Sequence, residues 1–225
     1  VYGDVGEVIS ELLSKLPSSS HSHAQEKANS VKKPWEEVRR KEAEDLSVPI
    51  RPPFIMDVLS RVIPPDAIIS IDVGENGWWF GRNFRMNGQK FVMSGYLATM
   101  GFGFPGAIAG KIAYPEKPVF CITGDGGFAV AMGDFVTAVK NNLSMVVIVL
   151  NNHELGMIRV EQQLEQYPNF ATSLHNPDFV LYARSCGGDG IRVEQPDVLE
   201  PAVKWAMNQQ CPVIVDVITD PRRFP

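Results

Sequence analysis

From residue 51 onward, short runs of apolar and β-branched residues alternate with longer segments whose apolar residues have helical spacing. The short runs read AIISID, FVM, VFCIT, MVVIVL, GIRV and PVIVDVIT, and the longer ones include FPGAIAGKIAY, FAVAMGDFVTAVK, LGMIRVEQQLEQ and DVLEPAVKWAMNQ. Strands that are apolar along their whole length are typical of parallel sheets with helices on both faces. The pattern therefore predicts an α/β fold with a mostly parallel six-stranded sheet covered by helices on both faces. In open sheets of this kind, ligands bind outside the carboxyl ends of the strands.

The composition bounds the classes of partner. The chain has 225 residues, of which 44% are hydrophobic and 21% charged, so it can bury a sizeable core as a soluble globular protein. A net charge of -5 gives no reason to expect nucleic acid or a membrane surface as a partner. No apolar run approaches the ~20 residues of a membrane-spanning helix. The three cysteines, Cys121, Cys186 and Cys211, are odd in number and widely spaced, which favours buried thiols in a reducing compartment, so we expect a cytoplasmic location.

The first fifty residues differ from the rest of the chain. Residues 5–16 have helical apolar spacing, whereas residues 17–34 are polar and Ser-rich and indicate a linker. A short charged helix is expected at residues 34–45. We expect residues 1–50 to be the end of a preceding (middle) domain plus a polar linker, and residues 51–225 to be the ligand-binding domain.

Polar residues follow two of the expected strands where each strand ends. Gly-Asp-Gly-Gly at residues 124–127 follows one apolar run, and the next run ends on a pair of asparagines. Short parallel crossovers place such strands side by side or close together, so Asp125 and Asn152 emerge at the same edge of the sheet. One carboxylate and one amide oxygen suit Mg²⁺, which completes its octahedron with phosphate and water, and glycines at a helix start can face an anion. The pair predicts a diphosphate bridged by Mg²⁺, although each motif alone also fits an ordinary turn or loop start.

A second glycine motif offers a competing hypothesis. GFGFPG, with Gly101, Gly103 and Gly106, matches the dinucleotide-binding pattern, and Asp125 lies downstream where a ribose-binding acid is found in such proteins. However, no clear buried strand ends directly before these glycines, and Pro105 resembles a residue of a first helical turn within the motif. A nicotinamide site is therefore the weaker interpretation.

The stretch SGYLATMGFGFPGAIAGKIAYPEKPVFCITGDGGFAVAMGDFVTAV, followed by the paired asparagines, resembles the thiamine-diphosphate-dependent enzymes related to pyruvate oxidase, acetolactate synthase and pyruvate decarboxylase. The resemblance covers residues 51–220 and implies the thiamine-diphosphate-binding fold for this part. It implies thiamine diphosphate and Mg²⁺ as cofactors, with the side chains of Asp125 and Asn152 and the backbone carbonyl of Glu154 as metal ligands. The cofactor-binding residues that it implies are Gly74, Glu75, Asn76, Ala98, Thr99, Met100, Asp125, Gly126, Gly127, Asn152, His153, Glu154, Leu155, Gly156, Met157 and Ile158.

The same resemblance implies catalytic parts inside and outside this chain. The carbonyl of Ala98 would accept a hydrogen bond from the aminopyrimidine amine, and Met100 would lie beneath the bend between the two rings of the cofactor. In the family, the glutamate that activates the aminopyrimidine comes from the N-terminal pyrimidine-binding domain of another subunit. The expected partner is therefore that domain, in a homodimer or homotetramer, and the chain is expected to be inactive without it.

The residues after the asparagines suggest a branch of the family. Val160 and Glu161 depart from the Gln-Trp pair usual in acetolactate synthases, and a glutamate here is usual in pyruvate oxidases. This resemblance implies oxidative decarboxylation of a 2-oxo acid, pyruvate, to an acetyl product, with FAD held mainly by the middle domain. Val73, Met157, Ile158 and Glu161 are expected on the substrate side, where Glu161 would be catalytic as a proton relay unless it is a solvated helix residue. Carboligation as in acetolactate synthases and a non-catalytic cofactor-binding subunit remain alternatives.

Overall fold

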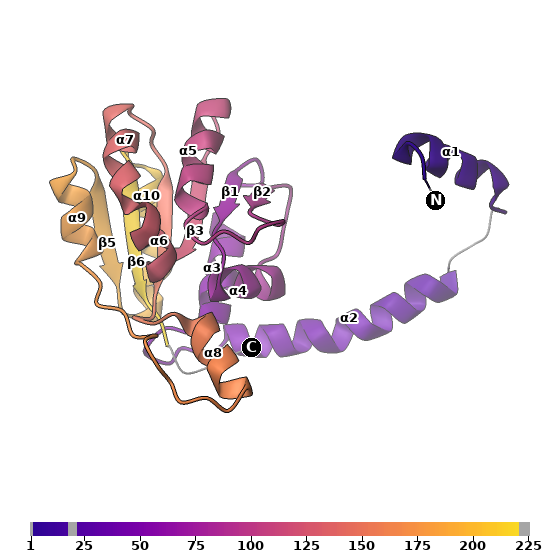
Figure 1. The fold of residues 1–225 in the computed structure, drawn as a ribbon, viewed down its shortest axis with the longest axis horizontal. Coiled ribbons are helices and arrows are strands. Elements are labelled where there is room, and N and C mark those ends of the chain that lie inside the picture. The colour runs from indigo at the N-terminus through magenta and orange to yellow at the C-terminus, as the bar shows by residue number, and fades with distance from the viewer. Residues whose placement is uncertain (1, 18–21, 221–225) are drawn as a thin grey trace. The chain divides into compact units, whose positions relative to one another are not determined.

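The computed structural model describes residues 2–17 and 22–220 and contains a six-stranded sheet in which every neighbouring pair of strands is parallel. The strand order is β2-β1-β3-β4-β6-β5. Figure 1 labels all of these strands except β4. The predicted α/β fold with a parallel six-stranded sheet is thereby confirmed. The strands are β1 (Ile68–Ile71), β2 (Lys90–Met93), β3 (Val119–Gly124), β4 (Val146–Asn151), β5 (Asp189–Val193) and β6 (Val213–Ile218).

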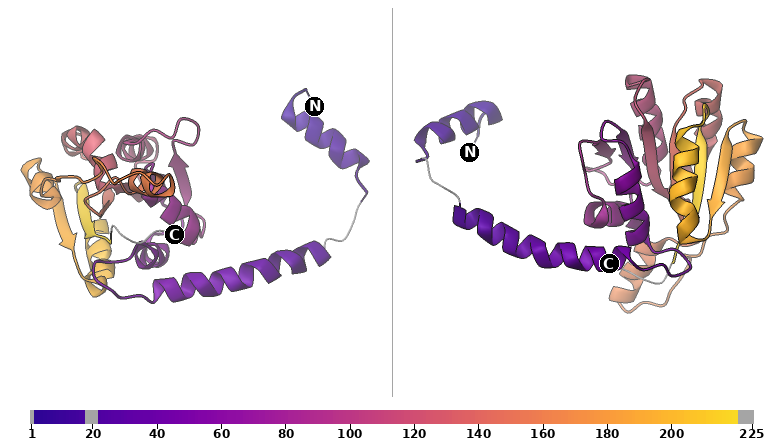
Figure 2. Two further views of the ribbon diagram at one scale, coloured as in Figure 1. Left: turned by 60° about the horizontal axis from the view of Figure 1, so that its bottom comes forward. Right: turned by 180° about the vertical axis from the view of Figure 1, so that it is seen from behind.

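Two apolar clusters, one on each face, hold helices against this sheet. In β3, Val119 and Cys121 belong to one cluster and Phe120 and Ile122 to the other, so a single strand is buried on both sides. Figure 2 shows the two helical layers from further directions. One layer consists of α3 (Pro52–Val62), α4 (Glu75–Asn83) and α10 (Pro196–Met207), and the other of α5 (Gly103–Ala113), α6 (Asp125–Ala131), α7 (Phe135–Lys140) and α9 (Phe179–Ser185).

The edge strand β2 differs from the buried strands. All four of its residues are exposed, although its sequence continues the apolar pattern. It pairs with β1 on one side only, because β1 lies between it and β3. An edge strand has fewer neighbours to cover it, and the sequence pattern alone does not distinguish it from a central strand.

The segment after the Gly-Asp-Gly-Gly motif is not one continuous helix. It consists of α6, a 3₁₀ turn at Met132–Asp134, and α7. Phe128 and Phe135 are fully buried, but Val136, which continues the same apolar spacing, is 51% exposed. A 3₁₀ turn advances the chain by a different angle per residue from an α-helix, so the apolar face predicted for one continuous helix is not maintained.

The first helix and most of the second belong to a separate compact unit. The chain divides into residues 1–40 and 41–225. Helix α1 (Val5–Lys15) begins after Asp4, whose carboxylate accepts hydrogen bonds from the backbone of Gly6 and Glu7. The predicted linker is largely helical instead, because α2 (Ser22–Ala43) runs through it and past Pro34, while residues 18–21 lie outside the described residues. None of the described helices is both long and apolar enough to cross a membrane.

The helix α6 that follows β3 is fixed by aromatic packing. The Phe128 ring lies 5.6 Å from that of Phe104 and 5.5 Å from that of Phe179, both in edge-to-face geometry. Because Phe128 is fully buried while Asp125 precedes it on the same helix, this packing fixes the start of α6 at the edge of the sheet.

We expect Phe128→Ala to lower the free energy of unfolding by about 3–5 kcal/mol, because it leaves a cavity among aromatic rings. Val130→Ala, at an exposed position of the same helix, should change it by less than about 0.5 kcal/mol. Urea unfolding followed by tryptophan fluorescence measures both. A loss below about 1 kcal/mol for Phe128→Ala would contradict this packing account.

Candidate cofactor and metal site

A cavity of about 380 Å³ lies at the carboxyl ends of the strands, where the arrowheads in Figure 1 point towards α8 (Gly156–Leu164). Its lining comes mostly from the segments that follow β1, β2, β3, β4 and β6, as expected for an open parallel sheet. The cavity brings together nearly all of the residues that the sequence predicted for the site. Those that line it are Val73, Gly74, Glu75, Asn76, Ala98, Met100, Asp125, Gly126, Gly127, Asn152, Glu154, Leu155, Gly156, Met157, Ile158 and Glu161.

Thr99 and His153 do not line the cavity, although both were predicted to bind the cofactor. The Thr99 backbone N–H donates instead to the Ser94 hydroxyl. His153 is exposed and has a positive φ of 57°, and its backbone carbonyl accepts a hydrogen bond from Leu174. The sequence motif contains both residues but neither lines the cavity, although His153 Nδ1 lies 3.4 Å from the amide nitrogen of Asn176.

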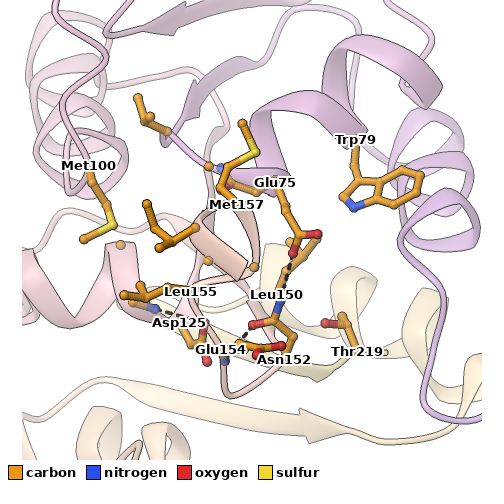
Figure 3. A pocket seen from close by; sticks show the side chains of 18 of the residues that line it. Glu75, Trp79, Met100, Asp125, Leu150, Asn152, Glu154, Leu155, Met157 and Thr219 are labelled. Carbon is orange, nitrogen blue, oxygen red and sulfur yellow. Dashed lines mark hydrogen bonds between the residues drawn. The ribbon is translucent and has the colours of Figure 1, made fainter. Parts of the chain in front are cut away.

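Asp125 and Asn152, the residues expected to bind Mg²⁺, lie close together in Figure 3. We call this part of the cavity its metal end. The side chain of Asp125 is almost completely buried, with 2% exposure. One carboxylate oxygen accepts from the backbone N–H of Gly126 at 3.0 Å, and the other accepts from the amide of Asn176 at 2.6 Å. Burial raises the pKa of Asp125, and the hydrogen bonds from Asn176, Gly126 and the His153 backbone lower it less than burial raises it. A bound cation would offset the cost of burying this charge.

Asn152 links the metal end to the rest of the cavity. Its amide nitrogen donates to Glu75 Oε2 at 3.0 Å, and its amide oxygen accepts from the backbone N–H of Glu154 at 3.0 Å (Figure 3). The Glu154 carboxylate is engaged elsewhere, since Arg159 Nε lies 2.7 Å from Oε2 and the Thr172 hydroxyl lies 3.1 Å from Oε1. This arrangement leaves Glu154 its backbone carbonyl as the group for a metal, which is the role that the family resemblance implied.

Glu75 places a second carboxylate inside the cavity. Burial raises the pKa of Glu75 to about 7, with the positive charge of Arg159 opposing this shift and the negative charge of Glu154 adding to it. The carboxylate lies against the backbone at the start of α8, because a Cβ atom at Gly156 would come within 2.0 Å of Glu75 Oε2. Only a residue without a side chain fits at Gly156 while Glu75 occupies this place.

The glycines of the motif are explained by packing within the protein. A Cβ atom at Gly127 would lie 2.8 Å from the Asp72 carboxylate, and one at Gly126 would lie 2.9 Å from the Leu155 side chain. The expectation that these glycines let the backbone approach a ligand is therefore not needed to account for them. The competing dinucleotide motif gains no support, because β2 ends at Met93, well before α5 begins at Gly103.

The segment that carries Ala98 and Met100 is attached to the sheet by a buried carboxylate. Asp72 follows β1 and is completely buried; it accepts hydrogen bonds from the Gly101 backbone at 2.8 Å and from the Thr123 hydroxyl at 2.9 Å. Ala98 has a positive φ of 48°, which is uncommon for a residue with a side chain. Met100 is 42% exposed and lines the cavity on the side opposite Trp79 in Figure 3.

The residues expected on the substrate side also line the cavity. Val73 and Met157 are partly buried, whereas Ile158 is 45% exposed and Glu161 is exposed. The position of Glu161 at the mouth of the cavity fits either a proton relay or a solvated helix residue. The roles assigned to these residues stay predictions.

Several residues around the cavity were not found from the sequence. Trp79 lines it from α4 and is nearly buried, with 2% exposure. Asn176 and Arg159, which contact Asp125 and Glu154, belong to no motif that we recognised. The remaining lining residues are Pro52, Gly124, Leu150, Thr219 and Asp220. Gly124, Leu150 and Thr219 could have been found from the strand ends alone, since each lies at or just after the end of a strand.

The donor set fits Mg²⁺ bound together with a phosphate-bearing ligand. Within the described residues, no three His, Cys, Asp or Glu side chains form a metal centre of their own. Asp125, Asn152 and the Glu154 carbonyl supply oxygen donors, which Mg²⁺ prefers, and the ligand would complete the octahedron. The carboxylates of Glu75, Asp125 and Glu154 would repel a free diphosphate, so a cation is needed for an anion to bind here.

The raised pKa of Glu75 gives a pH dependence with a defined sign. Its folded-state pKa of about 7 exceeds the model value of 4.5, so the native protein binds a proton that the unfolded chain releases at lower pH. Without metal and cofactor, the free energy of unfolding should therefore decrease as the pH rises from 4.5 to 7. Glu75→Gln should remove this contribution of roughly 1–3 kcal/mol, while Glu165→Gln, at an exposed position, should not. Unfolding curves collected across this pH range would contradict the account if wild type and Glu75→Gln ran parallel.

Comparison with known proteins agrees with this site. The family model described as "Thiamine pyrophosphate enzyme, C-terminal TPP binding domain" matches residues 72–217. The "Putative thiamine pyrophosphate-containing protein YdaP" of Bacillus subtilis (strain 168) is 42% identical over 82% of this chain and 32% of that protein. The mitochondrial acetolactate synthase catalytic subunit of Aspergillus candidus is 33% identical over 98% of this chain and 33% of that protein. The acetolactate synthase isozyme 2 large subunit of Escherichia coli (strain K12) is 33% identical over 75% of this chain and 31% of that protein.

The chain thus spans about a third of the length of these curated relatives. The family match covers β2 to β5 and all of β6 except its last residue, and it begins just after β1, so that α3 and β1 lie outside it. Together with the cavity at the carboxyl ends of the strands, it shows that this chain belongs to the thiamine pyrophosphate enzymes, through their C-terminal TPP binding domain.

Proposed function

We propose that this chain holds thiamine diphosphate and Mg²⁺ in the cavity, as part of an enzyme that decarboxylates a 2-oxo acid and joins the remaining fragment to a second 2-oxo acid. The observation that carries the proposal is that Asp125, Asn152 and Glu154 line one cavity at the carboxyl ends of the strands. Family membership supplies the cofactor, and the acetolactate synthases among the relatives support the joining step.

The residues at the two ends of the cavity have different tasks. Asp125, Asn152 and the Glu154 carbonyl would hold Mg²⁺, while the backbone near Gly126 and at the start of α8 would face the diphosphate. Bound there, thiamine diphosphate would supply the carbon nucleophile for the ketone of the 2-oxo acid and the electron sink after loss of CO2. Ala98 and Met100, held through the hydrogen bond from Gly101 to Asp72, would orient the ring end of the cofactor.

The substrate side is formed by apolar side chains and one acid. Val73, Met157 and Ile158 would exclude water from the reacting atoms, and Glu161 would hold or move a proton at the cavity mouth. The glutamate that activates the aminopyrimidine would come from an N-terminal pyrimidine-binding domain of another subunit. The proposed active form is therefore a homodimer or homotetramer, and a cytoplasmic location stays an expectation.

Oxidative decarboxylation of pyruvate with FAD is the second candidate. Its support is the glutamate at position 161, which lines the cavity where acetolactate synthases usually have tryptophan. The names of the relatives support the joining reaction better, since two of the three named above are acetolactate synthases. FAD would be held mainly by a middle domain and is not required by any described contact.

Replacing the metal-end carboxylate tests the cofactor assignment. We expect Asp125→Ala to weaken binding of thiamine diphosphate with Mg²⁺ by more than about 100-fold in the intact protein, because a charged ligand is lost. Asp134→Ala, at an exposed position after the same helix, should bind normally. Isothermal titration calorimetry measures both variants. Equal affinities for Asp125→Ala and wild type would rule out the proposed metal site.

Product analysis distinguishes the reactions. With pyruvate, thiamine diphosphate and Mg²⁺, the joining reaction should yield acetolactate with one CO2 released for each molecule formed. The oxidative reaction should instead bleach flavin absorbance when air is excluded and yield an acetyl product. If the intact protein binds the cofactor but forms neither product from pyruvate or other 2-oxo acids, the alternative of a non-catalytic cofactor-binding subunit is favoured.

A further inference from the structure

Asn176 bridges the metal-end carboxylate to a buried network. Its amide nitrogen donates to Asp125 Oδ2 at 2.6 Å and to Asn151 Oδ1 at 2.9 Å. An amide nitrogen carries two hydrogens, so these two bonds use both of them. The residue lies between α8 and α9, in a segment that no sequence motif connected with the site.

The network behind Asn176 fixes which group faces Asp125. Asn151 Nδ2 donates to Asp216 Oδ1 at 2.9 Å, and Asp216 is completely buried. A carboxylate only accepts hydrogen bonds, so the amide oxygen of Asn151 must point away from it, towards Asn176. The Asn151 amide oxygen needs a hydrogen-bond donor, so the amide nitrogen of Asn176 must face it. The same nitrogen then also donates to Asp125. The orientation of both amides therefore follows from the two carboxylates at the ends of the chain of hydrogen bonds.

Arg192 attaches this network to the segment that carries Asn176. Its Nε donates to Asp216 Oδ2 at 3.0 Å, and its guanidinium also lies 3.5 Å from Asp178 Oδ2. Asp178 caps α9 by accepting from the backbone of Val180 and Leu181. One cation thus fixes the buried carboxylate and the residue two positions after Asn176.

We infer that Asn176 is a positioning residue that sets the orientation of the Asp125 carboxylate for Mg²⁺, an inference that rests on the proposed function. Gly126 donates to one oxygen of Asp125 and Asn176 to the other, so the plane of the carboxylate is fixed before a cation arrives. A carboxylate has about four lone-pair sites, so these two hydrogen bonds and the one from the His153 backbone still leave one for the metal. Groups that orient metal ligands in this way commonly affect metal affinity by about 10- to 100-fold.

Metal selectivity distinguishes a positioning role of Asn176 from a merely structural role. Mg²⁺ demands near-ideal octahedral geometry, whereas the larger Ca²⁺ accepts irregular coordination. A carboxylate that is free to rotate should therefore bind Mg²⁺ less well while losing less affinity for Ca²⁺. If Asn176 only attached its segment to the sheet, its loss would lower the stability of the metal-free protein and leave the Mg²⁺ to Ca²⁺ ratio unchanged.

The test titrates Mg²⁺, and separately Ca²⁺, into the intact protein at saturating thiamine diphosphate and measures bound cofactor. Asn176→Ala removes the donor, and Asn176→Leu removes it while keeping a similar volume. Both should raise half-saturating Mg²⁺ about 10-fold, with excess Mg²⁺ restoring full occupancy, and should raise half-saturating Ca²⁺ less. His175→Ala, at the exposed neighbouring position, is the matched control and should titrate as wild type.

An unchanged Mg²⁺ half-saturation in both variants would overturn the inference. A wild-type titration of Asn176→Leu alone would also overturn it, because that result would show that the side-chain volume matters and the hydrogen bond does not.

If both variants fail to fold, Asn176→Ser is the variant to test, because its hydroxyl can donate to only one of the two acceptors. It should raise half-saturating Mg²⁺ by a smaller factor, and a wild-type titration would overturn the inference. If the wild-type protein does not bind the cofactor, the proposed function and this inference are both overturned. If the wild-type protein binds the cofactor and the Asn176 variants bind Mg²⁺ equally well, only this inference is overturned.

Discussion

The carboxylate of Asp72 is the interaction on which the cavity most depends. It is completely buried at the end of β1 and is surrounded by hydrogen-bond donors from β3 and from the segment before α5. A polar group in such a buried place is tolerated only when its oxygens accept hydrogen bonds, so the three parts of the chain must meet there. The glycines at 103 and 127 leave room for it, since a Cβ atom at either would approach the carboxylate within 3.0 Å. The position of Met100 over the cavity follows from this attachment.

The electrostatic character of the cavity comes from an excess of acid at its polar end. Glu75, Asp125 and Glu154 lie around Asn152, and Arg159 is paired with one of them. Such a site is poorly suited to a free anion and well suited to an anion that arrives with a divalent cation. The raised pKa values of Asp125 and Glu75 have the same origin, since burial in each case is the largest cause. Cation and diphosphate are therefore expected to bind together.

The sheet and the metal-end residues could be predicted because their signals are local. Apolar runs identify strands, and the carboxyl ends of parallel strands meet at one edge, which places Asp125 and Asn152 together without any further information. Asn176 and Trp79 could not be predicted, because a loop and a helix bring them to the cavity through packing that no short motif records. The helix α2 was missed because Ser, Gln and Lys were taken as linker residues, although the latter two are good helix formers. β2 is exposed because it lies at the edge of the sheet, and the apolar pattern of a strand does not show where in the sheet that strand lies.

The isolated bridge between Ile50 and Thr219 joins the segment before α3 to the segment after β6. The backbone of Ile50 donates to Ile218 at 3.2 Å and accepts from Asp220 at 3.3 Å, and Pro52, Thr219 and Asp220 line the cavity nearby. A fragment that began at residue 51 would lack both of these backbone hydrogen bonds. A circular permutant that joined the chain near Ile50 and Thr219 would therefore have to preserve the two hydrogen bonds of Ile50.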